Sequence, residues 1–128
     1  MNHEFSIRKK IYYHDTDAGG VVYYANYLKY LEEARAEFCL AKGISTKELM
    51  QKGIYFVVAH VDIKYKSSAR YGDEVKVITK IEKKGRSSIE FAQEIKREDK
   101  VLVIAKVTWV CVNRDFKPRS IPDEFASI

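Results

Sequence analysis

The chain has 128 residues, of which 46% are hydrophobic and 32% are charged. This length favours a single domain, residues 1–128, over a two-lobed enzyme, and the composition excludes both a disordered chain and a membrane-buried one. Lys and Arg number 23 against 18 Asp and Glu, and the net charge of +5 attracts polyanions such as nucleic acid, acidic lipid or a phosphorylated small molecule.

The first half of the chain is predicted to form a strand, a loop and two helices. Apolar and polar residues alternate over Phe5–Tyr12, which is the period of a half-buried strand, and the polar, glycine-bearing residues 14–20 predict a loop. Apolar residues at steps of three and four then predict a long amphipathic helix over Tyr24–Lys42. A Ser and a Glu three residues apart predict the capping box of a short second helix over 45–53.

The second half is predicted to form four more strands, which span Val57–Tyr65, Val75–Ile81, Ile89–Ile95 and Val101–Val112. The last of these is apolar on both faces, and each face then requires a cover. One helix covers only one face of such a sheet. We therefore expect a subunit interface over the other face, which carries Leu102, Ile104, Val110 and Val112.

The sequence also predicts the cellular setting. It contains no apolar run near the ~18 residues of a membrane-spanning helix. Met1–Lys10 alternates charged and apolar residues where a signal peptide would have an apolar stretch. We therefore expect a cytoplasmic protein. Cys39 and Cys111 lie far apart and in no metal-ligand spacing, so they are predicted to be reduced thiols in a packed interior, without a chemical role.

The densest group of chemically capable residues lies where the loop meets the long helix. The first backbone N–H groups of a helix have no partner within the helix and carry a partial positive charge. A carboxylate a few residues earlier, such as Asp17, would hold a water molecule or attack directly, while an N–H near Tyr24 polarises a carbonyl. A general base beside an oxyanion donor is an arrangement for acyl transfer, and Gly19 and Gly20 would let the backbone bend between the two.

Residues 15–27, DTDAGGVVYYANY, resemble the signature of the 4-hydroxybenzoyl-CoA thioesterase family of hotdog proteins, and most closely its YbgC-like acyl-CoA thioesterase branch. Residues 65–73 resemble the family's strand-and-turn segment, and residues 84–88 resemble its CoA-contacting turn. The order of elements matches over residues 5–122. The first segment is specific, because it combines two aspartates, a glycine and an Asn-Tyr pair at fixed spacing, and the other two support it.

The resemblance implies an α+β hotdog fold, in which a five-stranded antiparallel sheet wraps around a long central helix. It implies homodimers that join two sheets into one, frequent homotetramers, and active sites at the dimer interface. The implied reaction is hydrolysis of an acyl-CoA to a free acid and CoA. No metal or organic cofactor is expected, since CoA belongs to the substrate and product.

By the same resemblance, Asp17 is the catalytic carboxylate, acting as nucleophile or as general base, and the backbone N–H of Tyr24 polarises the thioester carbonyl. The expected substrate-binding residues are Gly20, Val57, Val58, Lys84, Gly85, Arg86, Ser87 and Ser88. The last five form a basic turn, whose charged and hydroxyl donors suit the phosphates of CoA.

One residue departs from the YbgC-like pattern. Members of that branch usually have a histidine directly after the Val-Val-Tyr. This chain has Tyr24 there, as the hydroxybenzoyl-CoA enzymes do. A proton-transfer role for that histidine would pass to another group here. A role for the backbone N–H survives any change of side chain.

Several of these residues have a structural interpretation as well. Asp15 is expected to cap a turn or the helix, and an isolated Asp17 would do the same. A metal site built from the aspartates with His14, His60 and Asp62 lacks any ligand spacing that would support it.

The tyrosines near the signature are expected to pack rather than to bind. Tyr23, Tyr27 and Tyr30 fall at helical spacing, which is typical of a core more than of a stacking platform. Asp73 follows a glycine and is expected to lie in a turn.

Two other functions compete with the thioesterase. A nucleic-acid-binding module would use the positive charge, but the sequence contains no RNA- or DNA-binding motif. A hotdog hydratase or dehydratase would share the fold, but would rely on a histidine and a carboxylate in a differently spaced motif. The sequence leaves open whether the thiol that carries the acyl group in the substrate is CoA or an acyl carrier protein.

Overall fold

Five antiparallel strands form one sheet, in the order β1-β3-β4-β5-β2, in a computed structural model that describes residues 4–128. The strands are β1 (Phe5–Lys10), β2 (Tyr55–Tyr65), β3 (Glu74–Lys84), β4 (Ser88–Arg97) and β5 (Lys100–Val112). Two helices, α1 (Asn26–Ala41) and α2 (Thr46–Gln51), lie between β1 and β2, and single 3-10 turns lie at Tyr13–Asp15 and Asp123–Phe125. The prediction that the N-terminus is not a signal peptide rests on Met1–Lys10, and the first three residues of that stretch lie outside the described residues.

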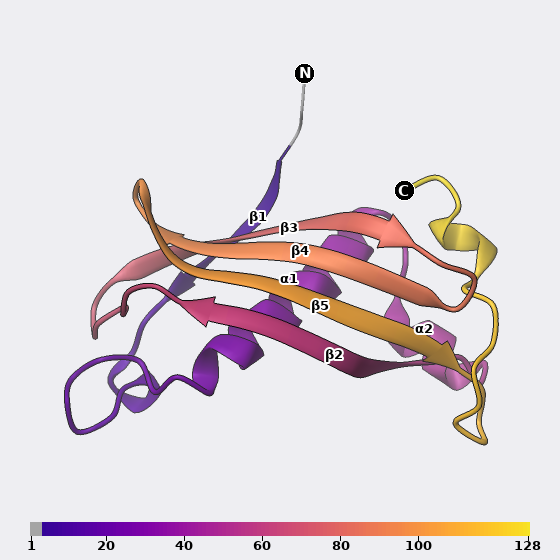
Figure 1. The fold of residues 1–128 in the computed structure, drawn as a ribbon, viewed down its shortest axis with the longest axis horizontal. Coiled ribbons are helices and arrows are strands. Elements are labelled where there is room, and N and C mark those ends of the chain that lie inside the picture. The colour runs from indigo at the N-terminus through magenta and orange to yellow at the C-terminus, as the bar shows by residue number, and fades with distance from the viewer. Residues whose placement is uncertain (1–3) are drawn as a thin grey trace.

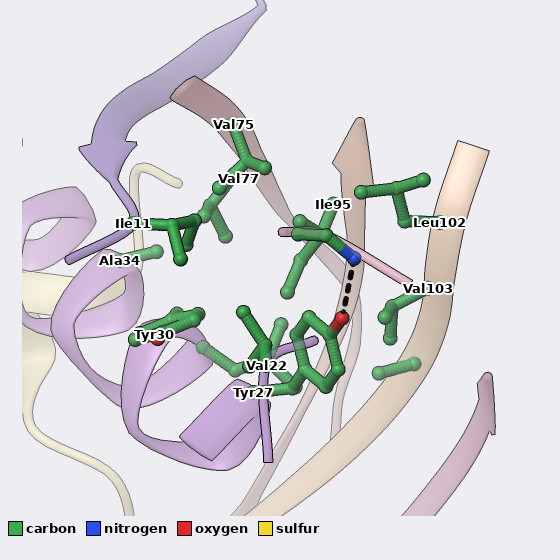
Figure 2. Close-up of a cluster of buried hydrophobic side chains, with 13 residues drawn as sticks. Ile11, Val22, Tyr27, Tyr30, Ala34, Val75, Val77, Ile95, Leu102 and Val103 are labelled. Carbon is green, nitrogen blue, oxygen red and sulfur yellow. Dashed lines mark hydrogen bonds between the residues drawn. The ribbon is translucent and has the colours of Figure 1, made fainter. Parts of the chain in front are cut away.

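The long helix covers one face of the sheet (Figure 1). Its apolar side chains at steps of three and four pack on β1 and β3, as predicted. Tyr27 and Tyr30 are buried in one cluster with Val75 and Val77 of β3 (Figure 2). The Tyr27 hydroxyl accepts a hydrogen bond from the N–H of Ala69 at 2.9 Å, which ties the helix to the segment after β2. The predicted α+β fold is confirmed.

The helix starts two residues later than its sequence pattern predicts. In the turn before it, the N–H of Asn26 donates to the carbonyl of Tyr23 at 2.9 Å, and the N–H of Tyr23 donates to the carbonyl of Asp15 at 3.0 Å. Tyr23 is 46% exposed, so its predicted place in the core is wrong, whereas Tyr27 and Tyr30 are buried as predicted. Helical spacing sets the direction of a side chain only inside the helix, and Tyr23 precedes it.

A β-bulge places Leu102 in the core. Its neighbours Val101 and Val103 pair with adjacent residues of β4, so Leu102 is an extra residue in β5. Leu102 and Val103 are both fully buried and belong to the same apolar cluster. The prediction that Leu102 lies on the outer face is therefore wrong, because the bulge reverses the alternation of side chains.

The outer face of β5 is less apolar than predicted for a second reason. Val112 is only 3% exposed, and it forms an isolated bridge with Pro118 in the C-terminal segment of its own chain. Ile104 and Val110 stay half-buried on that face. Two of the four residues on which the expected interface rested are thus covered within one copy.

The other local predictions hold with small shifts of boundary. β1 ends at Lys10 rather than Tyr12, and α2 is capped by Ser45, whose hydroxyl accepts the N–H of Glu48 at 3.1 Å. Cys39 and Cys111 are free and buried, as predicted, and burial raises the pKa of the Cys39 thiol to about 11. No helix within residues 4–128 is long and apolar enough to cross a membrane.

Candidate active site

Residues 15–24, between β1 and α1, form a loop that we call the signature loop, and Asp15 holds it together. Its carboxylate accepts the N–H of Tyr12 at 2.8 Å, and its carbonyl accepts the N–H of Tyr23 at 3.0 Å and the side-chain amide of Asn26 at 2.9 Å. The Asp15 side chain is buried. Its role is therefore structural, as predicted: it joins the end of β1 to the turn before α1.

The environment of Asp15 favours its charged form. Burial alone would raise the pKa of this carboxyl, but the N–H of Tyr12, the nearby Tyr30 hydroxyl and the positive charge of Lys9 outweigh burial. The pKa of Asp15 is lowered as a result. The hydrogen bond from the N–H of Tyr12 to this carboxylate is thus strongest when the carboxylate is ionised.

Asp17 lies exposed in the tight turn between the two anchored segments. Its Oδ1 accepts the N–H of Gly19 at 2.8 Å, and its N–H donates to the carbonyl of Val21 at 2.9 Å. Gly20 has a φ of +77°, a left-handed conformation that suits glycine. Within residues 4–128, the Oδ2 atom of Asp17 accepts no hydrogen bond, so one oxygen is free to act on a water molecule or a carbonyl.

Tyr24 and Ala25 offer two free backbone donors at the start of α1. Neither N–H donates to an acceptor in the described part of the chain. The helix N-terminus adds a partial positive charge at this position. The N–H predicted to polarise a carbonyl is therefore without an acceptor in residues 4–128, and its role stays a prediction. The Tyr24 ring is 60% exposed and lies 6.0 Å from the ring of Tyr65, at the C-terminal end of β2.

The signature loop docks beside the start of β3. Thr16 forms an antiparallel bridge with Val22, and Val21 forms another with Arg70, in the connection between β2 and β3. Asp73 lies in this connection, as predicted for a turn residue, and its carboxylate accepts the N–H of Arg70 at 2.8 Å. One loop, fixed at both ends, thus carries Asp17, Gly20 and Tyr24.

The other predicted site residues lie at the opposite end of the sheet (Figure 1). The basic turn, Lys84 to Ser88, joins the end of β3 to the start of β4, and Val57 and Val58 lie near the start of β2. β4 has 10 residues, so the two ends are ~33 Å apart. One copy of the chain therefore separates the predicted site into two groups, the loop of Asp17 and the basic turn.

Within the basic turn, only some side chains are free to bind a ligand. The Lys84 ammonium donates to the carbonyl of Phe125 at 3.0 Å and to that of Ile128 at 2.6 Å, so it holds the C-terminal segment. Arg86 is exposed and forms no ion pair with the residues described. Its carbonyl accepts the N–H of Ile121 at 2.9 Å, which fixes the backbone of the turn.

A groove of about 470 Å³ lies between α1, α2 and β2. Its walls include Met50, Phe56, Val58 and Trp109, and it contains the charged side chain of Arg35. Arg35 is not among the residues predicted for the site. The available signal was its position on the apolar stripe of the helix, where a charged residue is unusual.

The remaining candidates do not gather into a site. No three His, Cys, Asp or Glu side chains come together in residues 4–128 in a way that would hold a metal ion. His14 is exposed beside Asp15, and His60 is exposed on β2. A groove of about 700 Å³ along β3, β4 and β5 contains none of the predicted site residues.

Comparison with known proteins identifies the family. A sequence model of the thioesterase superfamily matches residues 19–104, a range that begins two residues after Asp17. Acyl-CoA thioester hydrolase YbgC of Escherichia coli is 38% identical over 115 residues, covering 88% of this chain and 86% of the relative. Acyl-CoA thioesterase YbgC of Haemophilus influenzae is 34% identical over 126 residues, covering 97% of this chain and 93% of the relative.

Solved structures agree with the sequence matches. DHNA-CoA thioesterase of Staphylococcus aureus superposes with a TM-score of 0.89 at 28% identity, covering 97% of this chain and 85% of that one. The five-stranded sheet and the long helix described above are common to both, since the match spans nearly the whole chain. The chain belongs to the thioesterase superfamily and has its hotdog fold.

Proposed function

We propose that the chain hydrolyses acyl-CoA thioesters to a free acid and CoA, and that Asp17 and the N–H of Tyr24 carry the reaction. The observation that supports this is the pairing of an exposed carboxylate with a free backbone donor in one anchored loop. The E. coli and H. influenzae relatives are named as acyl-CoA thioesterases. The expectation that no metal or organic cofactor takes part belongs to this proposal.

The chemistry follows from these two groups. As a general base, Asp17 takes a proton from water while the oxygen attacks the thioester carbon. As a nucleophile, Asp17 attacks the same carbon and forms a mixed anhydride, which water then hydrolyses. On both routes the N–H of Tyr24 donates to the carbonyl oxygen as it becomes negative. On both routes the tetrahedral adduct formed by this attack collapses, the carbon–sulfur bond breaks, and CoA leaves as the thiolate and is protonated. On the nucleophilic route this collapse yields the mixed anhydride, so CoA leaves before water hydrolyses it.

A second copy of the chain is proposed to complete the site. β2 is an edge strand of 11 residues, and Val58 and Val61 are 51% and 37% exposed on it. A long apolar edge strand is normally covered. Pairing of two identical edges about a two-fold axis is antiparallel. The Tyr65 end of one β2, with its Asp17 loop, would then lie beside the Val58 end of the other.

This dimer explains the division of the site. The Asp17 loop of one copy would meet Val57, Val58 and the basic turn of the other. Arg86, Ser87 and Ser88 would then bind the phosphates of CoA, with Gly85 permitting close approach. Lys84 would contribute through its charge while its ammonium holds the C-terminal segment.

Two dimers would form the expected tetramer through the outer face of the sheet, where Ile104 and Val110 stay half-buried. The protein would work in the cytoplasm, where Cys39 and Cys111 stay reduced.

Subunit complementation tests the shared site. Asp17→Asn and a double variant, Arg86→Glu with Ser87→Ala, should each lose most activity on acyl-CoA. When the two are unfolded together and refolded, half of the dimers combine one chain of each kind. Each of these has one intact site, so the mixture should recover about one quarter of the wild-type activity. No recovery would show that each site lies within one chain, and full activity of Asp17→Asn would remove Asp17 from the mechanism.

A further inference from the structure

Arg35 is a buried cation with no carboxylate in ion-pair contact, although the charge of Glu32, which lines the same groove, favours its protonated form. It is 5% exposed, and no Asp or Glu in the described chain lies within ion-pair distance of it. The ring of Trp109 lies 5.8 Å from its guanidinium carbon. Burial lowers the pKa of Arg35 to about 10, and the group stays charged at neutral pH. A buried charge of this kind is costly unless other groups hydrogen-bond to it.

A buried polar relay fixes the position of Arg35. Its Nη1 donates to the side-chain oxygen of Gln93 at 3.0 Å. The amide nitrogen of Gln93 donates in turn to the carbonyl of Leu31 and the hydroxyl of Thr79, both at 3.0 Å. Gln93 is therefore held from two sides and cannot turn away from Arg35. The guanidinium is oriented before any ligand arrives.

Most of the donors of Arg35 are unused. A guanidinium has five N–H groups, and the chain provides an acceptor for one nitrogen, Nη1. Nε is buried without a partner, and Nη2 donates to no acceptor within residues 4–128. Arg35 lines the groove between α1, α2 and β2. An oxygen atom that enters the groove would give Nη2 an acceptor that the described chain does not provide.

The groove has the volume and lining of a site for an acyl group. Its volume of about 470 Å³ suits a small ligand. Leu28 and Arg35 both line it and lie ~10 Å apart along α1. Met50, Phe56 and Trp109 give it apolar and aromatic walls. Val58 also lines the groove and pairs with Trp109, the residue whose ring contacts Arg35. In the proposed dimer, the partner's Asp17 loop would lie beside Val58, so an acyl group bound at that loop would pass Val58 and reach Arg35.

We infer that Arg35 is a specificity residue, which selects acyl groups that carry an oxygen acceptor, a hydroxyl or a carboxylate, at the end away from the thioester. This inference rests on the proposed function and names its substrate class. Apolar walls hold the body of the acyl group, and the oriented guanidinium binds its terminal oxygen. An acyl group without that oxygen would leave the charge unpaired in a filled groove.

Two matched pairs of CoA thioesters test the inference. Benzoyl-CoA and 4-hydroxybenzoyl-CoA differ by a hydroxyl, and hexanoyl-CoA and adipoyl-CoA differ by a terminal carboxylate. The wild-type chain should prefer the oxygen-bearing member of at least one pair by about tenfold or more in kcat/KM. The pair that shows the preference identifies which oxygen Arg35 binds.

Substitution then assigns the preference to Arg35. Arg35→Met should reduce the ratio to within about twofold of one, because kcat/KM falls for the oxygen-bearing member and rises for the plain member, which no longer leaves a charge unpaired. Arg35→Lys should retain part of a preference for carboxylate, because it keeps the charge. Lys29→Met is the control: Lys29 lines the same groove but is exposed, and its loss should leave the ratio unchanged.

Several results would overturn the inference. A wild-type ratio near one for both pairs would do so without any variant. So would a preference that persists in Arg35→Met. So would an Arg35→Met variant that sediments as a monomer and loses activity on both members of a pair alike, since Arg35 would then stabilise the dimer. If the wild-type chain hydrolyses none of the four thioesters, the proposed function itself fails. Hydrolysis without discrimination removes only the role of Arg35.

Discussion

The N–H of Tyr23 donates to the carbonyl of Asp15 at 3.0 Å, and this bond fixes where Asp17 and Tyr24 lie relative to each other. Asp17 follows Asp15 by two residues, and Tyr24 follows Tyr23 directly. The carboxylate of Asp17 and the N–H of Tyr24 thus lie within two residues of the same backbone hydrogen bond. Rate enhancement by a preorganised donor depends on such rigidity.

Proline at position 24 tests the backbone donor. Tyr24→Pro removes the N–H and should lower kcat by about 100-fold or more, the usual cost of losing one oxyanion donor. Tyr24→Ala keeps the N–H and loses the ring, so it is the matched control and should retain most activity. Circular dichroism checks that both variants fold. Equal losses in the two would assign the role to the tyrosine side chain instead.

Loss of the Tyr27 hydroxyl should destabilise the fold. Tyr27→Phe leaves the buried N–H of Ala69 without its acceptor, which costs about 1–3 kcal/mol in free energy of unfolding. Urea unfolding measures this change. Tyr65→Phe, at a 43% exposed tyrosine, should change stability far less. Similar losses in both variants would contradict the importance of the hydrogen bond.

The stability of the fold should depend on the charge of Asp15. Folding lowers the pKa of Asp15 below its usual value of 3.8, so the ionised group stabilises the folded state above that pH. This contribution is lost as the pH falls through the lowered value. Asp15→Asn should therefore have a lower free energy of unfolding than wild type at neutral pH. In urea unfolding, the difference between the two free energies should narrow below about pH 4.

The exposed Asp62 provides the control for that experiment. Asp62→Asn should show no such convergence with pH. A constant difference between wild type and Asp15→Asn at every pH would mean that the lost contacts of Asp15 are independent of its charge.

Two residues of the basic turn should behave differently. Arg86→Met should raise KM for an acyl-CoA several-fold, since its exposed guanidinium is free to bind phosphate. Lys84→Met should change KM by less than about twofold, because its ammonium already holds two carbonyls. It should instead speed proteolysis of the C-terminal segment. Steady-state kinetics and limited proteolysis separate these effects, and the reverse pattern would assign the phosphate to Lys84.

The sequence predicted the elements of the fold well, because they depend on local period. The steps of three and four in α1 and the alternation in β2 to β5 read directly as helix and strands. Leu102 was misplaced because a β-bulge changes the alternation without a signal in residue type. Tyr23 was misplaced because a hydrogen bond to Asp15 holds it in a turn.

The site was predictable only in part, for reasons of distance along the chain. Asp17, Gly20 and Tyr24 lie in one motif, and the fold keeps them in one loop. The separation of Asp17 from Arg86 depends on the direction of β3, and no local pattern encodes it. Arg35 was missed because its importance comes from Gln93, which is 58 residues away in the sequence.

The burial of Cys39 and Cys111 has a practical result for the enzymologist. A thiol that is enclosed and protonated reacts slowly with disulfide dyes and peroxide. When a disulfide dye is used to measure the CoA that the reaction releases, the thiols of the protein itself should therefore add little signal. The protein should also tolerate mild oxidants during long incubations.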